Sequence, residues 1–153
     1  MSNVPTWKRS LSKIEYIYKT YQLAILVGRI VHNSAGKYKD TYGEIVIKNC
    51  ERALYHGRVA NEIKIIDPLT FNDREYELKE MRAEVDNVAT YAFIWFEEIR
   101  SFDGVNKKIK DKTYKWEDQV GILADEIIKL IDGVCRYDRK IFREQLSTTE
   151  AAL

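Results

Sequence analysis

The sequence predicts an all-α protein, an antiparallel up-down-up-down four-helix bundle that forms a single domain over residues 1–153. Glycine and proline are scarce, with 7 and 2 residues, which disfavours the many turns of a β-sandwich. Hydrophobic residues make up 45% and charged residues 32%, enough apolar surface for one core beneath polar helix faces. Apolar residues also recur at three- and four-residue spacing in four separate segments, the period of amphipathic helices.

The first helix is expected over about residues 12–33. Ser12 is followed three residues later by Glu15, the pattern of a capping box at a helix start. The segment HNSAG, residues 32–36, breaks the apolar period. The stripe expected to face the core is Ile14, Ile17, Tyr21, Ala24, Ile25 and Gly28.

The second helix is expected over about residues 41–66, where Thr41 and Glu44 repeat the same start signal. The dipeptide Asp67-Pro68 is expected to stop it, because a residue before proline is biased away from helical geometry. The predicted inward stripe is Val46, Cys50, Ala53, Gly57 and Ala60.

The third helix is expected over about residues 71–100, with Thr70 or Asn72 as its cap. Its stripe keeps a helical period throughout and consists of Leu78, Met81, Val85, Val88, Ala92, Trp95 and Ile99. Residues 101–113 contain a glycine, an asparagine and several lysines without a period, so a loop is expected there.

The fourth helix is expected over about residues 114–143, with an inward stripe of Trp116, Val120, Leu123, Ile127, Leu130 and Val134. Helices with short connections prefer antiparallel packing, which places the first and third connections at the same end. Residues 37–42 (KYKDTY) and 107–115 (KKIKDKTYK) should then converge and gather basic side chains on one flank.

Charge is unevenly distributed along the chain, although the net charge is only +1. Lys and Arg stand against Asp and Glu at 11 to 5 in residues 1–66, 4 to 9 in residues 67–100 and 10 to 10 in residues 101–153. This polarity predicts one basic surface and one acidic surface.

The sequence offers no pattern for catalysis, a metal or a cofactor. Neither His32 nor His56 has a glutamate three residues before it, as di-metal bundle sites require. Cys50 and Cys135 lie in apolar periodic segments and are expected to be buried free thiols. No leader and no apolar stretch of about 20 residues is found, so we expect a cytoplasmic protein without a membrane partner.

The outward face of the second helix is the first candidate binding surface. With 100° per residue, Lys48, Arg52 and Tyr55 project from one side, opposite Cys50 and Ala53. Two cations one turn apart can contact successive phosphates, and a tyrosine can stack on a base. The structural alternative is that Glu44 and Glu51 pair with these cations on an ordinary solvated surface.

Two further basic groups have similar alternatives. The first group is Lys107, Lys108, Lys110, Lys112 and Lys115, which are expected either to bind nucleic acid or only to keep an exposed loop soluble. Arg136, Arg139, Lys140 and Arg143 are placed near the end of the fourth helix, where cations offset the helix dipole. Gly28, Gly57 and Gly133 within helices are expected to mark close helix–helix approach.

Two segments resemble a known family. KYKDTYGEIVIKNCERAL (37–54) is similar to the second-helix start, and ADEIIKLIDGVCRYDRK (124–140) to the last-helix end, of the accessory variability determinant proteins of diversity-generating retroelements. The resemblance implies a four-helix bundle related to proteins encoded in ribosomal-RNA intervening sequences. It also implies a ring-shaped homopentamer that binds RNA or DNA and the element's reverse transcriptase during mutagenic cDNA synthesis. By this resemblance, the expected nucleic-acid contacts are Lys37, Lys39, Lys48 and Arg52.

A second hypothesis belongs to another functional class. The acidic segment 67–100 and the aromatic edges of the bundle would serve a helical protein–protein interaction module of a phage or mobile element, without nucleic-acid binding. Oligomeric state and affinity for nucleic acid separate the two hypotheses.

Overall fold

The computed structural model describes residues 14–34, 36, 42–102 and 104–152, with side chains through Thr148. This part of the chain consists of four helices, α2 (Glu15–Asn33), α4 (Gly43–Glu62), α5 (Pro68–Ser101) and α6 (Lys107–Ala152), and contains no strand. The prediction of an all-α protein with four helices is confirmed.

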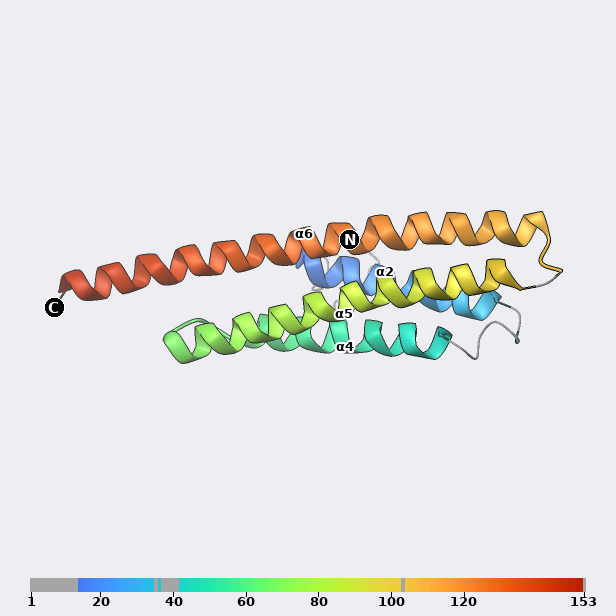
Figure 1. Ribbon diagram of the computed structural model, residues 1–153. Helices are drawn as coiled ribbons and strands as arrows, with labels where there is room; N and C mark the ends of the chain where they lie inside the picture. The colour runs from blue at the N-terminus through green and yellow to red at the C-terminus, as the bar shows by residue number, and fades with distance from the viewer. Residues whose placement is uncertain (1–13, 35, 37–41, 103, 153) are drawn as a thin grey trace, which may run out of the picture.

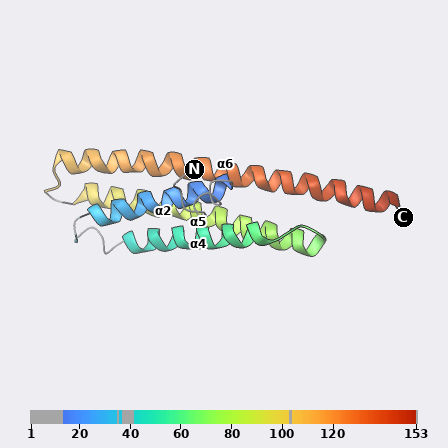
Figure 2. The same ribbon diagram turned by 180° about the vertical axis from the view of Figure 1, so that it is seen from behind.

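The helices lie along one long axis and form an elongated molecule (Figures 1 and 2). α4 packs against α2 and α5, and α6 packs against the other sides of α5 and α2. α4 and α6 therefore lie on opposite sides of the molecule, as both views show. The end of α2, the start of α4 and the α5–α6 connection share one end (Figure 1).

The core is built mainly from the predicted stripes of α4 and α5. All seven stripe residues predicted for α5 are buried, and Trp95 is the largest of them. All five predicted for α4 are buried as well. Burying a large apolar side chain contributes about 1.5–3 kcal/mol, so the α5 stripe contributes more to the hydrophobic stabilisation than the small residues of the α4 stripe.

The stripe predicted for the first helix is out of phase. Of its six residues only Ile17 is buried, and Ile25 is 38% exposed. The buried residues of α2 are Tyr16, Ile17, Thr20, Leu23, Val27 and Ile30. α2 carries apolar residues on more than one face, so its period alone does not determine which face turns inward.

The first two helices begin, as described, without a side-chain cap bond. α2 begins at Glu15, with Ile14 at the N-cap position, and the expected cap Ser12 lies outside the described residues. α4 begins at Gly43 after Tyr42, and the expected cap Thr41 likewise lies outside the described residues.

The boundary between α4 and α5 differs from the prediction. α4 ends at Glu62, and α5 begins at Pro68 with Asp67 as its N-cap, so residues 63–66 are not helical. The Thr70 amide donates to Asp67 Oδ1 at 2.7 Å, and the Asp67 amide donates to the Thr70 hydroxyl at 3.1 Å. Thr70 is thus the third helical residue and not the cap. Proline suits the first helical position because that residue needs no amide hydrogen.

Arg74 joins three helices near the end of α4. Its Nη1 donates to the carbonyl oxygen of Ala60 at 2.8 Å, and its Nε donates to Asp138 Oδ2 at 2.6 Å. The Arg74 and Asp138 side chains are 16% and 10% exposed. One guanidinium on α5 therefore satisfies a terminal carbonyl of α4 and a buried carboxylate of α6.

Of the three helix glycines that were expected to mark close approach, only Gly57 does so. A Cβ on Gly57 would lie 2.8 Å from the Met81 sulfur atom, so α4 and α5 pack closely there. A Cβ on Gly28 would meet nothing within 4 Å, and one on Gly133 would meet only the Arg136 guanidinium at 3.9 Å. The prediction is therefore confirmed for Gly57 and wrong for the other two.

Both cysteines are free, and they differ in burial. Cys50 is 2% exposed, and burial raises the pKa of its thiol to about 12. Cys135 is only partly buried, which corrects the expectation of two buried thiols. In the described part of the chain, no helix combines the length and the apolarity needed to cross a membrane.

Candidate nucleic-acid interface

The start of α6 places lysines of the expected loop on a helix. The Ile109 amide donates to the Asn106 side-chain oxygen at 2.9 Å, and the Lys110 amide donates to the Asn106 carbonyl at 3.1 Å. Asn106 thus caps a helix that begins at Lys107. The prediction of a loop over residues 101–113 is wrong from Lys107 onward. Ile109 and Thr113 face the core and continue the inward stripe of α6 toward its N-terminus, ahead of Trp116.

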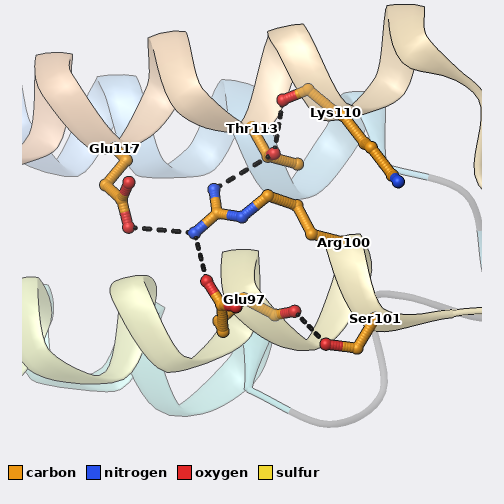
Figure 3. A network of polar contacts seen from close by, with 6 residues as sticks. All are labelled: Glu97, Arg100, Ser101, Lys110, Thr113 and Glu117. Atoms are coloured by element: carbon orange, nitrogen blue, oxygen red, sulfur yellow. Dashed lines mark hydrogen bonds and ion pairs between the residues drawn. The ribbon is translucent and has the colours of Figure 1, made fainter.

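The inward stripe leaves a group of lysines on the outer side of α6. Thr113 is fully buried, whereas Lys107, Lys108, Lys112 and Lys115 are exposed. These four residues form the proximal cluster, and together with Asp111 they line a wide, shallow hollow. Lys110 is also exposed, but it lies on the side of α6 that faces the Arg100 network (Figure 3).

Arg100 fixes the start of α6 against the end of α5 (Figure 3). Its guanidinium donates to the Thr113 hydroxyl at 3.2 Å, to Glu97 at 2.8 Å and to Glu117 at 3.2 Å. The Thr113 hydroxyl in turn donates to the carbonyl oxygen of Lys110 at 2.7 Å. The first turns of α6, which carry the proximal cluster, are therefore held in a defined position.

The guanidinium of Arg100 stays charged although its side chain is only 7% exposed. Burial lowers its pKa, but hydrogen bonds to Glu97 and Glu117 and the charges of both carboxylates outweigh burial and leave it raised. The guanidinium also lies 4.2 Å from the centre of the Tyr114 ring, within cation–π distance.

The lysines at the start of α6 lack the carboxylate partners that other basic side chains of the protein have. Among the described residues, the basic side chains paired with a carboxylate are Lys19, His56, Arg74, Lys79, Arg82, Arg100, Lys129 and Arg139. No lysine between residues 107 and 115 belongs to this set. Lys107 and Lys108 are the first two residues of α6 and therefore lie at the positive end of the helix dipole. No acidic residue in the first turn offsets their charge. Cations there are destabilising by about 0.3–1 kcal/mol each.

The α4 face predicted to bind nucleic acid is exposed as expected. Lys48 and Arg52 point to solvent, and Tyr55 is 63% exposed with its ring edge-on to His56 at 5.3 Å. Among the described residues, neither Lys48 nor Arg52 forms an ion pair with Glu44 or Glu51. The pairing that the structural alternative supposes is therefore absent among the described side chains, which remain exposed to solvent.

The structure does not bring the candidate residues onto one flank. Lys48, Arg52 and Tyr55 face outward from α4, whereas the proximal cluster lies on the outer face of α6, on the opposite side of the molecule (Figures 1 and 2). The other two candidates, Lys37 and Lys39, lie outside the described residues. The two described sets thus form separate basic surfaces.

A third basic group lies farther along α6. Arg136, Lys140 and Arg143 are exposed, and Arg139 beside them pairs with Glu75 of α5. The interpretation of this group as compensation of the helix dipole is wrong, because α6 continues to Ala152. Residue 143 lies more than two turns before that end, and the dipole acts mainly within the last turn.

No three His, Cys, Asp or Glu side chains of the described chain come together in a way that could hold a metal ion. No protein-family model, no curated protein and no solved structure matches the chain. The geometry and chemistry of the basic surfaces therefore carry the functional argument.

Proposed function

We propose that the protein is a non-catalytic accessory protein that binds RNA or DNA, and that the proximal cluster is its principal contact. The observation that carries this proposal is a group of exposed lysines without carboxylate partners among the described residues, on the first turns of a helix where cations are unfavourable. A phosphate backbone would supply the missing negative charge. Phosphate contacts of this kind give affinity without sequence selectivity.

The biological setting of the proposal comes from the family resemblance of residues 37–54 and 124–140. In this setting the chain is an antiparallel up-down-up-down bundle that assembles as a homopentamer and binds the reverse transcriptase of a diversity-generating retroelement. The separate α4 surface of Lys48, Arg52 and Tyr55 would then contact a second stretch of nucleic acid. Light scattering of the purified protein tests the assembly, and a monomer at micromolar concentration contradicts it.

Salt-dependent binding tests the nucleic-acid proposal. Fluorescence anisotropy with labelled RNA and DNA at about 50 and 200 mM KCl should show affinity that falls steeply with salt. The triple variant K107Q/K108Q/K112Q should bind more weakly at low salt. On a duplex, the slope of log K against log salt should also become shallower by about 0.9 for each phosphate that the variant no longer neutralises.

The matched control is the triple variant K64Q/K79Q/K129Q. It removes three exposed lysines from three other places, two of them already paired with carboxylates at helical spacing. The change in net charge equals that of the cluster variant, so a difference between the two variants reports position rather than total charge. Equal loss of affinity in both variants, or no binding by the unmodified protein at low salt, contradicts the proposal.

A second function is favoured by the apolar surface at the α4–α5 turn. Ile66, Leu69 and Tyr76 are 77%, 68% and 59% exposed, and the exposed residues Asp67 and Asp73 are their neighbours in the sequence. Such a patch is typical of a protein-interaction site. If a partner protein binds there, I66E/L69E should abolish the complex in size-exclusion chromatography, whereas K107Q/K108Q/K112Q should retain it.

A further inference from the structure

The outer face of α6 carries a second basic group aligned with the first. Arg136, Lys140 and Arg143, here called the distal cluster, are exposed and form no ion pair with a described carboxylate. They line one open hollow together with Arg139 and Glu144. Because α6 extends well beyond Arg143, these cations do not serve to offset the helix dipole. Like the proximal cluster, they have no evident structural role.

The phase of α6 shows that both clusters project in the same general direction. At 100° per residue, all fully inward positions fall within about 60° of arc, from Thr113 through Val120, Ala124, Ile127 and Ile131 to Asp138. The helix therefore keeps one face to the bundle over its packed length. The proximal and distal clusters both centre on the opposite face, away from the other helices.

The gap between the two clusters is close to the repeat of a nucleic-acid duplex. Twenty-one residues separate Lys115 from Arg136, which at 1.5 Å per residue is about 32 Å. The outermost pair, Lys107 and Arg143, lies about 54 Å apart along the helix axis. One turn of B-form DNA, about 34–36 Å, falls within this range.

The middle of the same face offers no net attraction for phosphate. Asp125 pairs with Lys129 at 2.8 Å, and Glu126 pairs with Lys19 at 3.0 Å. Asp118 is exposed there and adds a negative charge. A single strand following α6 would hold its phosphates beside these carboxylates, whereas a duplex along α6 would turn its grooves toward much of this middle and bring the same strand back to α6 after one turn.

From this arrangement we propose that α6 is a duplex-binding rod that contacts the phosphate backbone at two crossings about one helical turn apart. The inference rests on the proposed nucleic-acid function and specifies its ligand as a duplex longer than about one turn, or about 10 bp. Contacts to the backbone alone make the binding independent of base sequence.

Duplex length is the variable that tests this inference. Anisotropy at about 100 mM KCl with labelled DNA duplexes of roughly 8, 14, 20 and 26 bp should show a steep rise in affinity between the 8 bp duplex, which is shorter than one helical turn, and the three longer duplexes. The R136Q/K140Q/R143Q variant should lose about tenfold or more on the 26 bp duplex and little on the 8 bp duplex. K107Q/K108Q/K112Q should lose affinity at every length, and circular dichroism melting verifies that each variant is folded.

The possible failures are distinguishable. Equal affinity of the distal-cluster variant and the unmodified protein for the 26 bp duplex overturns the inference and leaves the proposed function intact. Equal affinity for a 26-nucleotide single strand, with the same dependence on the distal cluster, overturns the assignment of a duplex. Absence of binding to every nucleic acid overturns both proposals.

Discussion

Replacement of Arg100 by methionine should loosen the joint between α5 and α6. Methionine retains an unbranched stem of similar length in the space that Arg100 occupies, but it has neither charge nor hydrogen-bond donors. The variant therefore isolates the polar contacts of Figure 3 from the packing of the stem.

The magnitude follows from the burial of each contact. The bond to Glu117, whose side chain is 29% exposed, contributes about 1.5–3 kcal/mol as a hydrogen bond to a charged group. The bond to Glu97, 72% exposed, contributes at most a few tenths of a kcal/mol. The Tyr114 contact adds about 0.5–1 kcal/mol, and release of a buried charge offsets part of the sum. We expect a net loss of about 2 kcal/mol, or about 4–8 °C in melting temperature.

Urea unfolding followed by circular dichroism measures this loss, with Lys79→Met on the exposed side of α5 as the control. Hydrogen exchange should rise most over residues 107–117 and little in the middle of α4. An unchanged unfolding midpoint, or an increase in exchange spread evenly over all helices, would show that Arg100 does not fix the start of α6.

Four other changes have defined outcomes. Arg74→Ala leaves the carboxylate of Asp138 buried without its partner, and we expect a loss of about 3–5 kcal/mol by urea unfolding. Gly57→Leu forces a side chain against Met81 and should cost about 2–3 kcal/mol by the same measurement, whereas Gly28→Leu, with open space around it, should cost little. Hydrogen bonds from Thr70 lower the pKa of Asp67, so its contribution is present above the unfolded pKa and is lost as pH falls through the folded one. Asp67→Ala should thus lower the urea midpoint at pH 7 but not at about pH 2. With a thiol reagent at about pH 8, Cys135 should react before Cys50, because burial raises the pKa of Cys50 to about 12.

Each of these expectations has a contrary result. An Arg74→Ala variant as stable as the unmodified protein would show that Asp138 finds water or another donor. Equal costs at Gly57 and Gly28 would contradict the close approach of α4 and α5. A constant midpoint difference down to about pH 2 would remove Asp67 as the titrating cap. Simultaneous reaction of both thiols would indicate that α4 opens readily.

The elements that could be predicted from sequence are those in which one apolar stripe stands against polar residues. The α5 stripe from Leu78 to Ile99 is of this kind, so its period and its phase were both correct. α2 shows the limit, because Tyr21, Ile25 and Leu26 make a second apolar face beside Leu23 and Val27. Only the neighbouring helices decide which of the two faces is covered.

The sequence indicates candidate basic residues, but not how the fold arranges them. High lysine content hid a helix start at Asn106, although Ile109, Thr113 and Trp116 already follow the helical period. Arg100 and Arg74 carried no signal, because their contacts with Glu117 and Asp138 of α6 depend on how the helices pack. The separation of the α4 and α6 surfaces depends on which helices are neighbours, and charge counts along a sequence contain no such information.

The guanidinium of Arg74 also has a consequence for the order of events in folding. Its partner Asp138 is 64 residues away along the chain, so the contact can form only after α4, α5 and α6 have docked. We expect such contacts to be absent from the folding transition state. Their removal should then raise the unfolding rate and leave the refolding rate unchanged. In stopped-flow experiments on Arg74→Ala, only the unfolding arm of the chevron should move, and a slower refolding arm would mean that these three helices meet early.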